Sequence, residues 1–96
     1  MTTYISLIEY TEEGIEHMDE SPERLAQARE VCEANGGELT HFFLTLGRYD
    51  AVAITEFPDK ESATRALLTV AQGGAVSTET LTAFTESEYE ELVGSL

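Results

Sequence analysis

The chain has 96 residues, of which 19 are acidic and 5 are basic, and its formal net charge is −14. A chain of this length forms one domain, residues 1–96, and buries only about 60 to 65% of the surface that its unfolded form exposes, so oligomerisation is expected. The acidity excludes nucleic acids and anionic membranes as partners, because both repel such a surface.

The acidic residues are dispersed along the chain, and Lys60 is the only lysine. This composition favours adaptation to high intracellular salt, which screens the repulsion between carboxylates. The alternative is an acidic surface for a basic partner protein. The amino terminus has neither a basic start nor a continuous apolar run, so we expect no signal peptide, no membrane span and a cytoplasmic protein.

The first third of the chain predicts a strand followed by a helix. Residues 4–10 alternate in polarity with a period of two, which indicates the strand. Thr11–Gly14 has the composition of a turn. Ser21 and Pro22 mark the helix start, because serine caps free amides and proline suits the first helical position. The pair Gly36–Gly37 ends that helix.

The middle of the chain predicts a β-hairpin. Strands are expected at Glu38–Leu46 and Ala51–Phe57, because apolar and β-branched residues fill both segments. Between them lies the short connection Gly47–Asp50, with the sequence Gly-Arg-Tyr-Asp. Its glycine opens the turn and its aspartate closes it through local hydrogen bonds.

The last third predicts a helix, a strand and a short terminal helix. Asp59 caps a helix with an apolar stripe at helical spacing, and Gly73–Gly74 ends it. Val76–Phe84 alternates as a fourth strand, and the capping-box pattern Thr85–Glu88 starts a helix that runs through Leu92. The order βαββαβ plus a helix predicts an α+β ferredoxin-like sandwich with a four-stranded antiparallel sheet.

In this fold both long helices cover one face of the sheet, and the other face is polar unless a partner buries it. We place Val52 and Ile54 on the helix side. The hairpin residues expected on the open side are His41, Phe43, Ala53 and Thr55. The first and fourth strands offer a mixed set for an interface or pocket: Tyr4, Ser6, Ile8, Tyr10, Thr78, Thr80, Thr82 and Phe84. A second copy on the open face would close a barrel with cavities inside, so we expect a homodimer or larger homo-oligomer.

Several sequence blocks also resemble the small proteins of the GYD-domain family. The blocks are Tyr4–Gly14, Ser21–Arg24, Gly36–Gly37, Thr45–Asp50, Pro58–Asp59 and Thr78–Phe84, which together span nearly the whole chain. The resemblance implies a dimeric α/β barrel of the ferredoxin-like class, in a family of largely unknown function. A weaker similarity connects the hairpin to effector-binding domains of leucine-responsive-type regulators, which bind small molecules at oligomer interfaces.

Two residues are candidates for catalysis, and each has a structural alternative. His41 could act as an acid or base in a pocket, or be a hydrogen-bonded interface histidine. Asp50 could be a general acid or base, or accept backbone amide hydrogens and hold the turn. The two do not form a dyad within one subunit, because His41 is expected opposite about Glu56, far along the hairpin from Asp50.

Four residues are candidate ligand contacts. Tyr4, Tyr10 and Thr80 would line a pocket together with His41, and Tyr49 would lie at its rim, unless it is a packing residue. We therefore expect a homo-oligomer that holds a small organic ligand between the open sheet face and its cover. The alternatives are a cofactor-free enzyme of isomerase or oxygenase type in the same pocket, by analogy with related barrels, and a structural or effector-sensing assembly module.

The sequence indicates no cofactor and no metal site. Cys32 has no second cysteine to pair with and is expected as a small buried residue on a helix, not as a reactive thiol. His17 lies among acidic residues where a divalent cation could bind, but a solvated run of charge explains the same pattern. The chain lacks a phosphate-binding glycine loop, a nucleophile elbow and a zinc motif, so covalent catalysis and nucleotide chemistry have no support.

Overall fold

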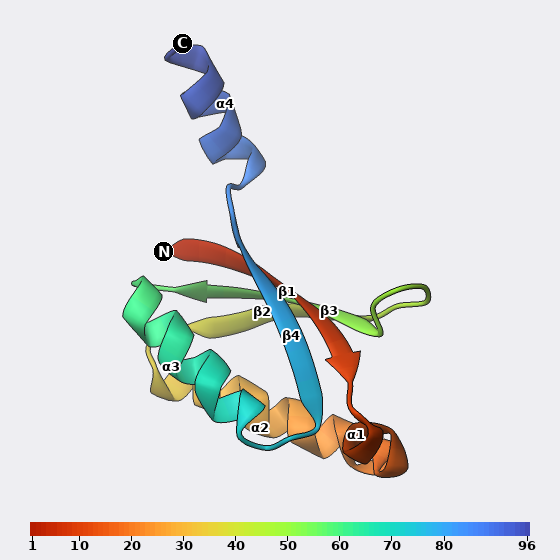
Figure 1. Cartoon of the computed structure of the whole chain (residues 1–96). Coiled ribbons are helices and arrows are strands. Elements are labelled where there is room, and N and C mark those ends of the chain that lie inside the picture. Colours follow the sequence, from red (N-terminus) through yellow and green to blue (C-terminus); the bar gives the residue numbers. More distant parts are fainter.

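The computed structural model describes residues 1–96 as a four-stranded antiparallel sheet with two long helices on one face and a further helix beyond it (Figure 1). The elements are β1 (Thr2–Tyr10), α1 (Glu12–Glu16), the 3-10 turn η1 (Met18–Glu20), α2 (Ser21–Ala34), β2 (Glu38–Leu44), β3 (Ala51–Phe57), α3 (Lys60–Ala71), β4 (Val76–Ala83) and α4 (Glu86–Gly94). The strand order β2-β3-β1-β4, with every pair antiparallel, confirms the ferredoxin-like prediction.

Local sequence signals set the ends of the helices. The Asp59 carboxylate accepts a hydrogen bond from the Ser62 N–H at 2.7 Å and caps α3. At the start of α4, Thr85 and Glu88 form a reciprocal capping box. Gly36 ends α2 with φ 78°, a conformation that glycine adopts without strain. These boundaries confirm the helix predictions.

The hairpin between β2 and β3 differs from its prediction in two ways. Its connection covers residues 45–50, longer than the expected Gly47–Asp50 tip. A β-bulge between Leu39 and His41 also shifts the register of β2. His41 therefore pairs with Ile54 and not with a residue near Glu56.

The observed register reverses the predicted faces of β3. Ala53 and Thr55 are buried under the helices, whereas the alternating residues Val52 and Ile54 lie on the opposite face. Both placements made from the sequence were wrong, because the bulge and the longer connection change which residues face each other. We call the face under α2 and α3 the covered face and the opposite one the open face.

The central strand β1 and the edge strand β4 follow the same rule. Tyr4, Tyr10 and Thr80, expected on the open face, share the covered face with Ser6. That expectation was wrong, because the helices pack on the aromatic and hydroxyl side of β1. His41 lies on the open face, as predicted. The open face carries the apolar side chains of Ile5, Leu7, Phe43, Val52, Ile54 and Leu81 and also those of His41, Glu56 and Glu79.

The core lies between the covered face and the two long helices, and it is small. Its buried cluster consists of Tyr4, Cys32, Leu39, Phe57, Ala63 and Ala66. Phe57 is the only large side chain that is fully buried. So few buried apolar groups leave many large apolar residues on the surface, as expected for a domain of this size. No helix has the length and apolar character that are needed to cross a bilayer.

Candidate ligand-binding site

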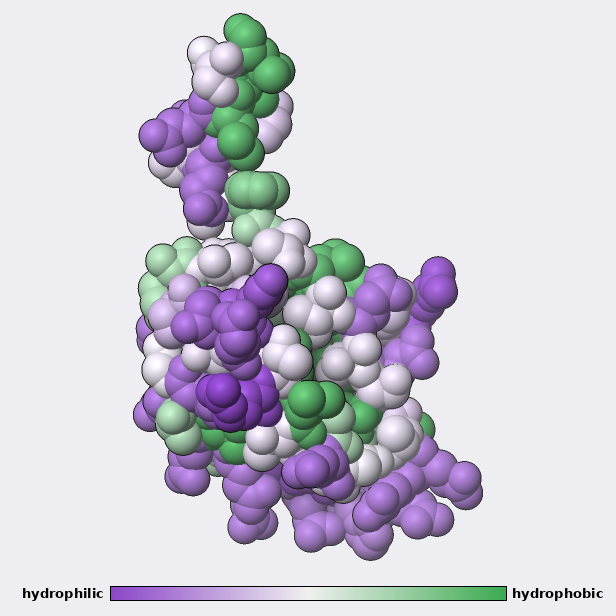
Figure 2. All heavy atoms as spheres, turned by 60° about the vertical axis from the view of Figure 1, so that its left-hand side comes forward, coloured by the Kyte–Doolittle hydropathy of each residue, from purple (hydrophilic) through white to green (hydrophobic).

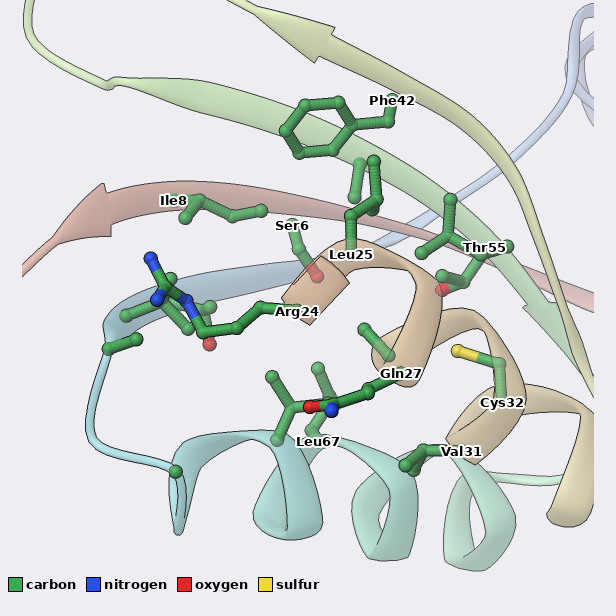
Figure 3. Close-up of a pocket in the computed structure, with 18 of the residues that line it drawn as sticks. Ser6, Ile8, Arg24, Leu25, Gln27, Val31, Cys32, Phe42, Thr55 and Leu67 are labelled. Atoms are coloured by element: carbon green, nitrogen blue, oxygen red, sulfur yellow. The ribbon is translucent and has the colours of Figure 1, made fainter. Parts of the chain in front are cut away.

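A cavity of about 330 Å³ lies between the covered face and the helices α2 and α3 (Figure 3). Most of its wall is apolar, and the apolar side chains include Ile8, Leu25, Val31, Phe42, Leu67 and Val70. Ligand pockets in proteins have volumes of about 300 to 1,000 Å³ and mostly apolar walls. The cavity can therefore hold a small organic molecule, and it lies on the face opposite to the one expected.

One cation lines this cavity, and no carboxylate does. Arg24 extends from α2 toward the end of the cavity near Ile8 (Figure 3). Its guanidinium donates hydrogen bonds to the carbonyl oxygens of His17 at 3.1 Å and Gly14 at 3.3 Å, which fix its position. The only contact of the chain at salt-bridge distance joins His17 Nδ1 to the Glu20 carboxylate at 3.2 Å, so no carboxylate pairs directly with Arg24.

Other polar groups of the cavity are neutral. Gln27 reaches from α2 toward Leu67 of α3 (Figure 3). Tyr10, Ser6 and Thr78 come from the sheet. These groups offer hydrogen bonds without adding charge. The cavity thus combines an apolar body with a few polar groups, of which Arg24 alone is charged.

Of the predicted ligand contacts on the sheet, Tyr10 lines the cavity and two do not. Tyr4 is buried in the core, with its ring edge toward Phe57 at a centroid distance of 6.1 Å. Thr80 lies next to the cavity, and its hydroxyl is 2.9 Å from that of Ser6. Tyr4 and Thr80 therefore shape the covered face without reaching the space where a ligand would lie.

Asp50 holds the hairpin against β1. Its carboxylate accepts a hydrogen bond from the Tyr10 N–H at 2.8 Å, and its own N–H donates to the Ile8 carbonyl at 2.8 Å. Beside it, the Tyr49 carbonyl accepts the Thr45 hydroxyl at 2.7 Å. The Asp50 carboxylate thus accepts a backbone amide hydrogen, but from β1 and not from within the turn, where the Asp50 carbonyl accepts the Thr45 N–H at 2.9 Å. Neither Asp50 nor Tyr49 lines the cavity.

His41 lies exposed on the open face, away from the cavity. Its ring stacks on Phe43 with centroids 6.1 Å apart and planes inclined by 13°. Its Nδ1 is 3.0 Å from the Thr40 hydroxyl. It shares no hydrogen bond with Asp50, so the structure brings the two candidate catalytic residues into no direct contact.

Cys32 is buried in the core, as predicted, and its side chain forms part of the cavity wall (Figure 3). Burial raises the pKa of its thiol, and the nearby Arg29 offsets only part of this effect. A thiol with a raised pKa stays protonated at neutral pH and is a poor nucleophile. No three His, Cys, Asp or Glu side chains converge as metal ligands anywhere in the chain, and His17 contacts only Glu20 among them.

Sequence reasoning missed Arg24 and Gln27. The available signal for Arg24 was a basic residue on the apolar stripe of α2, four positions before Ala28, in a chain with very few cations. The signal for Gln27 was absent, because a glutamine on a helix is usually solvated. Both residues line the cavity only because α3 and the sheet close the space around their side chains in the folded protein.

Known proteins share both sequence and fold with this chain. The family model of the GYD domain matches residues 4–93. A Thermus thermophilus protein described as a glutamine synthetase and cystathionine beta-lyase binding protein is 34% identical over 84 residues, which cover 86% of this chain and 88% of that protein.

Two solved structures are similar in fold. TTHA0845 from Thermus thermophilus has a TM-score of 0.57 and 23% identity, over 88% of this chain and 95% of that chain. SnoaB from Streptomyces nogalater, a cofactor-independent oxygenase, has a TM-score of 0.54 and 17% identity, over 88% of this chain and 92% of that chain. At these identities the likeness concerns the fold alone.

Proposed function

The chain belongs to the GYD-domain family, and we propose that it is a homo-oligomeric protein that binds a small organic ligand in the cavity between its sheet and its two long helices. The observation that carries the proposal is the charge of the cavity. The chain has 19 acidic residues, yet none of them lines the cavity, where Arg24 is the single charge. This contrast favours a ligand with an apolar body and one anionic group.

Arg24 suits the role of anchor for that anionic group. Two of the five guanidinium N–H donors are engaged by main-chain carbonyls, so the others remain free for a ligand. A carboxylate pairs with guanidinium through short, strong hydrogen bonds, and apolar surroundings strengthen the attraction. We therefore propose small carboxylic acids with an apolar aromatic or branched body as the ligand class.

Binding without turnover fits the cavity better than catalysis. Its wall contains no histidine, aspartate or glutamate that could act as a general base. His41 lies on the open face, and the Asp50 carboxylate is engaged by the Tyr10 amide. The alternative of a cofactor-free oxygenase is supported only by the shared fold with SnoaB.

A homodimer formed through the open face is part of the proposal. The open face is rich in large apolar side chains, and Phe43 and Leu81 on it are about half exposed. Contiguous apolar surface of this kind marks interaction sites. The dispersed acidic residues further support a protein that works in a cytoplasm of high salt. A melting temperature that does not rise with KCl would contradict the salt adaptation.

A second candidate function comes from the relative in Thermus thermophilus, which is described as binding two enzymes. We propose that this chain also docks on a metabolic enzyme and that the ligand modulates the docking. Co-purification of the tagged chain with purified glutamine synthetase and cystathionine beta-lyase from its own organism tests this function. Failure to retain either enzyme, with and without ligand, would contradict it.

The binding function is tested by titrating the full chain with phenylacetate and its neutral amide, phenylacetamide, followed by calorimetry. We expect the acid to bind more tightly than the amide. Arg24→Met should reduce affinity for the acid by about tenfold or more and leave the amide unaffected, because only the acid uses the guanidinium. Arg65→Met, on the exposed side of α3, is the matched control and should bind as the wild type does. Equal affinity for acid and amide, or no effect of Arg24→Met, would overturn the proposal.

A further inference from the structure

The C-terminal helix α4 stands away from the rest of the molecule. It rises on the side of the sheet opposite α2 and α3 (Figure 1), and the molecule is correspondingly elongated, with principal extents of 49, 31 and 16 Å. The hydrogen bonds of α4 and its cap stay within residues 85–96. Nothing else in the chain therefore holds this helix in place.

One side of α4 is apolar and the other is acidic (Figure 2). What we call the apolar stripe of α4 consists of Tyr89, Leu92 and Val93 of the helix and Leu96 two residues beyond it, at positions i, i+3, i+4 and i+7. These side chains are between 48% and 103% exposed. Glu90 and Glu91 lie on the opposite side. A stripe of this kind is the surface with which a helix normally packs against a protein.

The sequence nevertheless builds α4 as a defined helix. The Thr85 hydroxyl accepts the Glu88 N–H at 3.2 Å, and the Glu88 carboxylate accepts the Thr85 N–H at 2.8 Å. Phe84 and Tyr89 occupy the two positions of a hydrophobic staple. A helix as short as α4 is marginal in water by itself, and most of the stability of protein helices comes from packing of the apolar side. The capped helix therefore needs a surface to pack on.

We propose that α4 is an arm that packs its apolar stripe against a second copy of this chain when two copies stack through their open faces. A second copy on the open face would lie on the side of the sheet from which α4 projects (Figure 1). A two-fold axis gives both copies the same contact, so each arm holds the other subunit. The inference rests on the proposed homodimer.

An arm would enlarge the interface that the open face offers. Four strands spaced about 4.8 Å apart, with about seven residues each at about 3.4 Å per residue, give the open face a flat outline of roughly 450 Å². The apolar stripe of α4 projects on the same side of the sheet and adds to the surface that a second copy can cover (Figure 1).

Charge favours a second copy over a basic protein as the occupant. Each copy carries a net charge of −14, so contact between two copies is favoured where acidic groups are few. The apolar stripe of α4 carries no acidic group, and on the open face Glu56 and Glu79 lie beside the apolar centre formed by Ile5, Leu7, Val52 and Ile54. A basic partner would instead be attracted to the acidic side of α4, which carries Glu90 and Glu91, and would leave the stripe exposed.

A short connection joins α4 to β4. Only Phe84 and Thr85 separate β4 from α4. Thr85 is extended, with φ −67° and ψ 165°, and the capping box holds it in that conformation. This short connection, with one of its two residues held in an extended conformation, lets α4 project away from the end of β4 (Figure 1).

The test measures the dimer dissociation constant of the full chain by analytical ultracentrifugation. The double variant Leu92→Gln/Val93→Gln removes two apolar side chains from each arm and should weaken the dimer roughly 100-fold or more. The matched control Glu90→Gln/Glu91→Gln alters the opposite side of the same helix and should leave the dimer as tight or tighter. Circular dichroism should show that both variants keep the fold, because α4 makes no bond to the body.

The other outcomes separate the arm from the dimer and from the ligand. A wild-type dimer that is unaffected by Leu92→Gln/Val93→Gln would overturn the arm and leave the open-face dimer standing. A wild-type monomer would overturn both, while phenylacetate binding would still decide the ligand function. The apolar variant could also abolish binding to glutamine synthetase or cystathionine beta-lyase and keep the dimer. The stripe would then be a contact surface for another protein, and the inference would be wrong.

Discussion

The two faces of the sheet differ in what covers their apolar side chains: the covered face combines large residues such as Tyr4 and Phe57 with small and hydroxyl ones, and the open face leaves large apolar residues without cover. The covered face carries small and hydroxyl residues such as Ser6, Ala53 and Thr55. The open face carries Leu7, Ile54 and other large apolar residues. Small residues under the helices leave space for a cavity, and large ones outside are suited to bury area against a partner.

The helices therefore cover only part of the apolar surface of the sheet. Tyr4 and Phe57 are buried under α2 and α3, whereas large apolar residues such as Ile54 stay on the other face. Here the arrangement divides two tasks between the faces, with ligand binding proposed for one and association for the other. Substitutions confined to one face should therefore affect one task and spare the other.

The largest effect is expected from a charge on the open face. Ile54 pairs with Ile5 on one side and His41 on the other, which places it in the middle of the face. Ile54→Asp should weaken the dimer roughly 1,000-fold or more, because an unpaired carboxylate would be buried between two sheets. Affinity for phenylacetate should change less than about threefold if the two faces act independently.

The control for this substitution is Leu46→Asp, which adds the same charge at a fully exposed position of the hairpin connection. Sedimentation of both variants separates burial of the charge from the general repulsion between acidic chains. Equal weakening by the two variants would mean that net charge, and not the open face, governs association.

The next largest effect is expected from filling the cavity. Ala28 of α2 lines it, and Ala28→Leu would occupy part of its volume. Affinity for phenylacetate should fall by roughly 50-fold, since the added atoms compete for the space of the ligand. The melting temperature should stay equal or rise, because the new side chain meets empty space. Ala26→Leu on the exposed side of α2 is the matched control and should leave affinity unchanged.

If the Ala28→Leu variant bound phenylacetate as the wild type does, the ligand would lie elsewhere, for example between the open faces of two copies. That result would place the binding function on the open face. Dimer formation should not change in either variant, which makes the test complementary to Ile54→Asp.

Much of the fold could be predicted from the sequence because its signals are local. The Asp59 cap and the Thr85–Glu88 box each act within four residues, and the alternation of β1 is visible in its own segment. The faces of the hairpin could not be assigned, since a bulge at Leu39 and His41 leaves no local pattern. One residue of slip moves every side chain to the other face.

The candidate site was less predictable for a related reason. Tyr10 was predicted as a ligand contact and lines the cavity, although the face predicted for it was wrong. Arg24 was missed, because its place in the cavity depends on the closure of α2, α3 and the sheet around it. His41 and Asp50 were predicted as catalytic candidates because histidine and aspartate can act as acids or bases, yet neither lines the cavity.

A smaller effect is expected from Asp50, which ties the hairpin to β1 and so maintains the register that separates the two faces. Asp50→Ala leaves the partly buried Tyr10 N–H without its acceptor. The free energy of unfolding in urea should fall by about 1 to 2 kcal/mol. His41→Ala, which removes a side chain exposed on the open face, should change monomer stability by less than about 0.5 kcal/mol.

The Asp50→Ala variant also tests whether Asp50 belongs to the ligand-binding site. If Asp50→Ala lowered affinity for phenylacetate and left the unfolding free energy unchanged, Asp50 would belong to the binding site and the hairpin would share its task. If both properties fell together, the loss of affinity would follow from the loss of register.

The smallest effect concerns the arm and its dependence on pH. The hydrogen bond from the Thr85 N–H lowers the pKa of Glu88 below its ordinary value of about 4.3. A lowered folded-state pKa means that the capping box stabilises α4 above this ordinary value and loses that contribution as the pH falls through the folded-state pKa. Acid should therefore fray the arm and, through it, loosen the association of open faces.

The difference between the wild type and Glu88→Gln isolates this contribution, because all other carboxylates titrate alike in both proteins. Far-ultraviolet circular dichroism should show a small reversible loss of helix below about pH 4.3 in the wild type that the variant lacks. The dimer dissociation constant should change over the same range in the wild type, while the difference in phenylacetate affinity stays constant. If the difference in phenylacetate affinity between the two proteins changed as Glu88 became protonated, the arm would influence the covered face. The two faces would then not act independently.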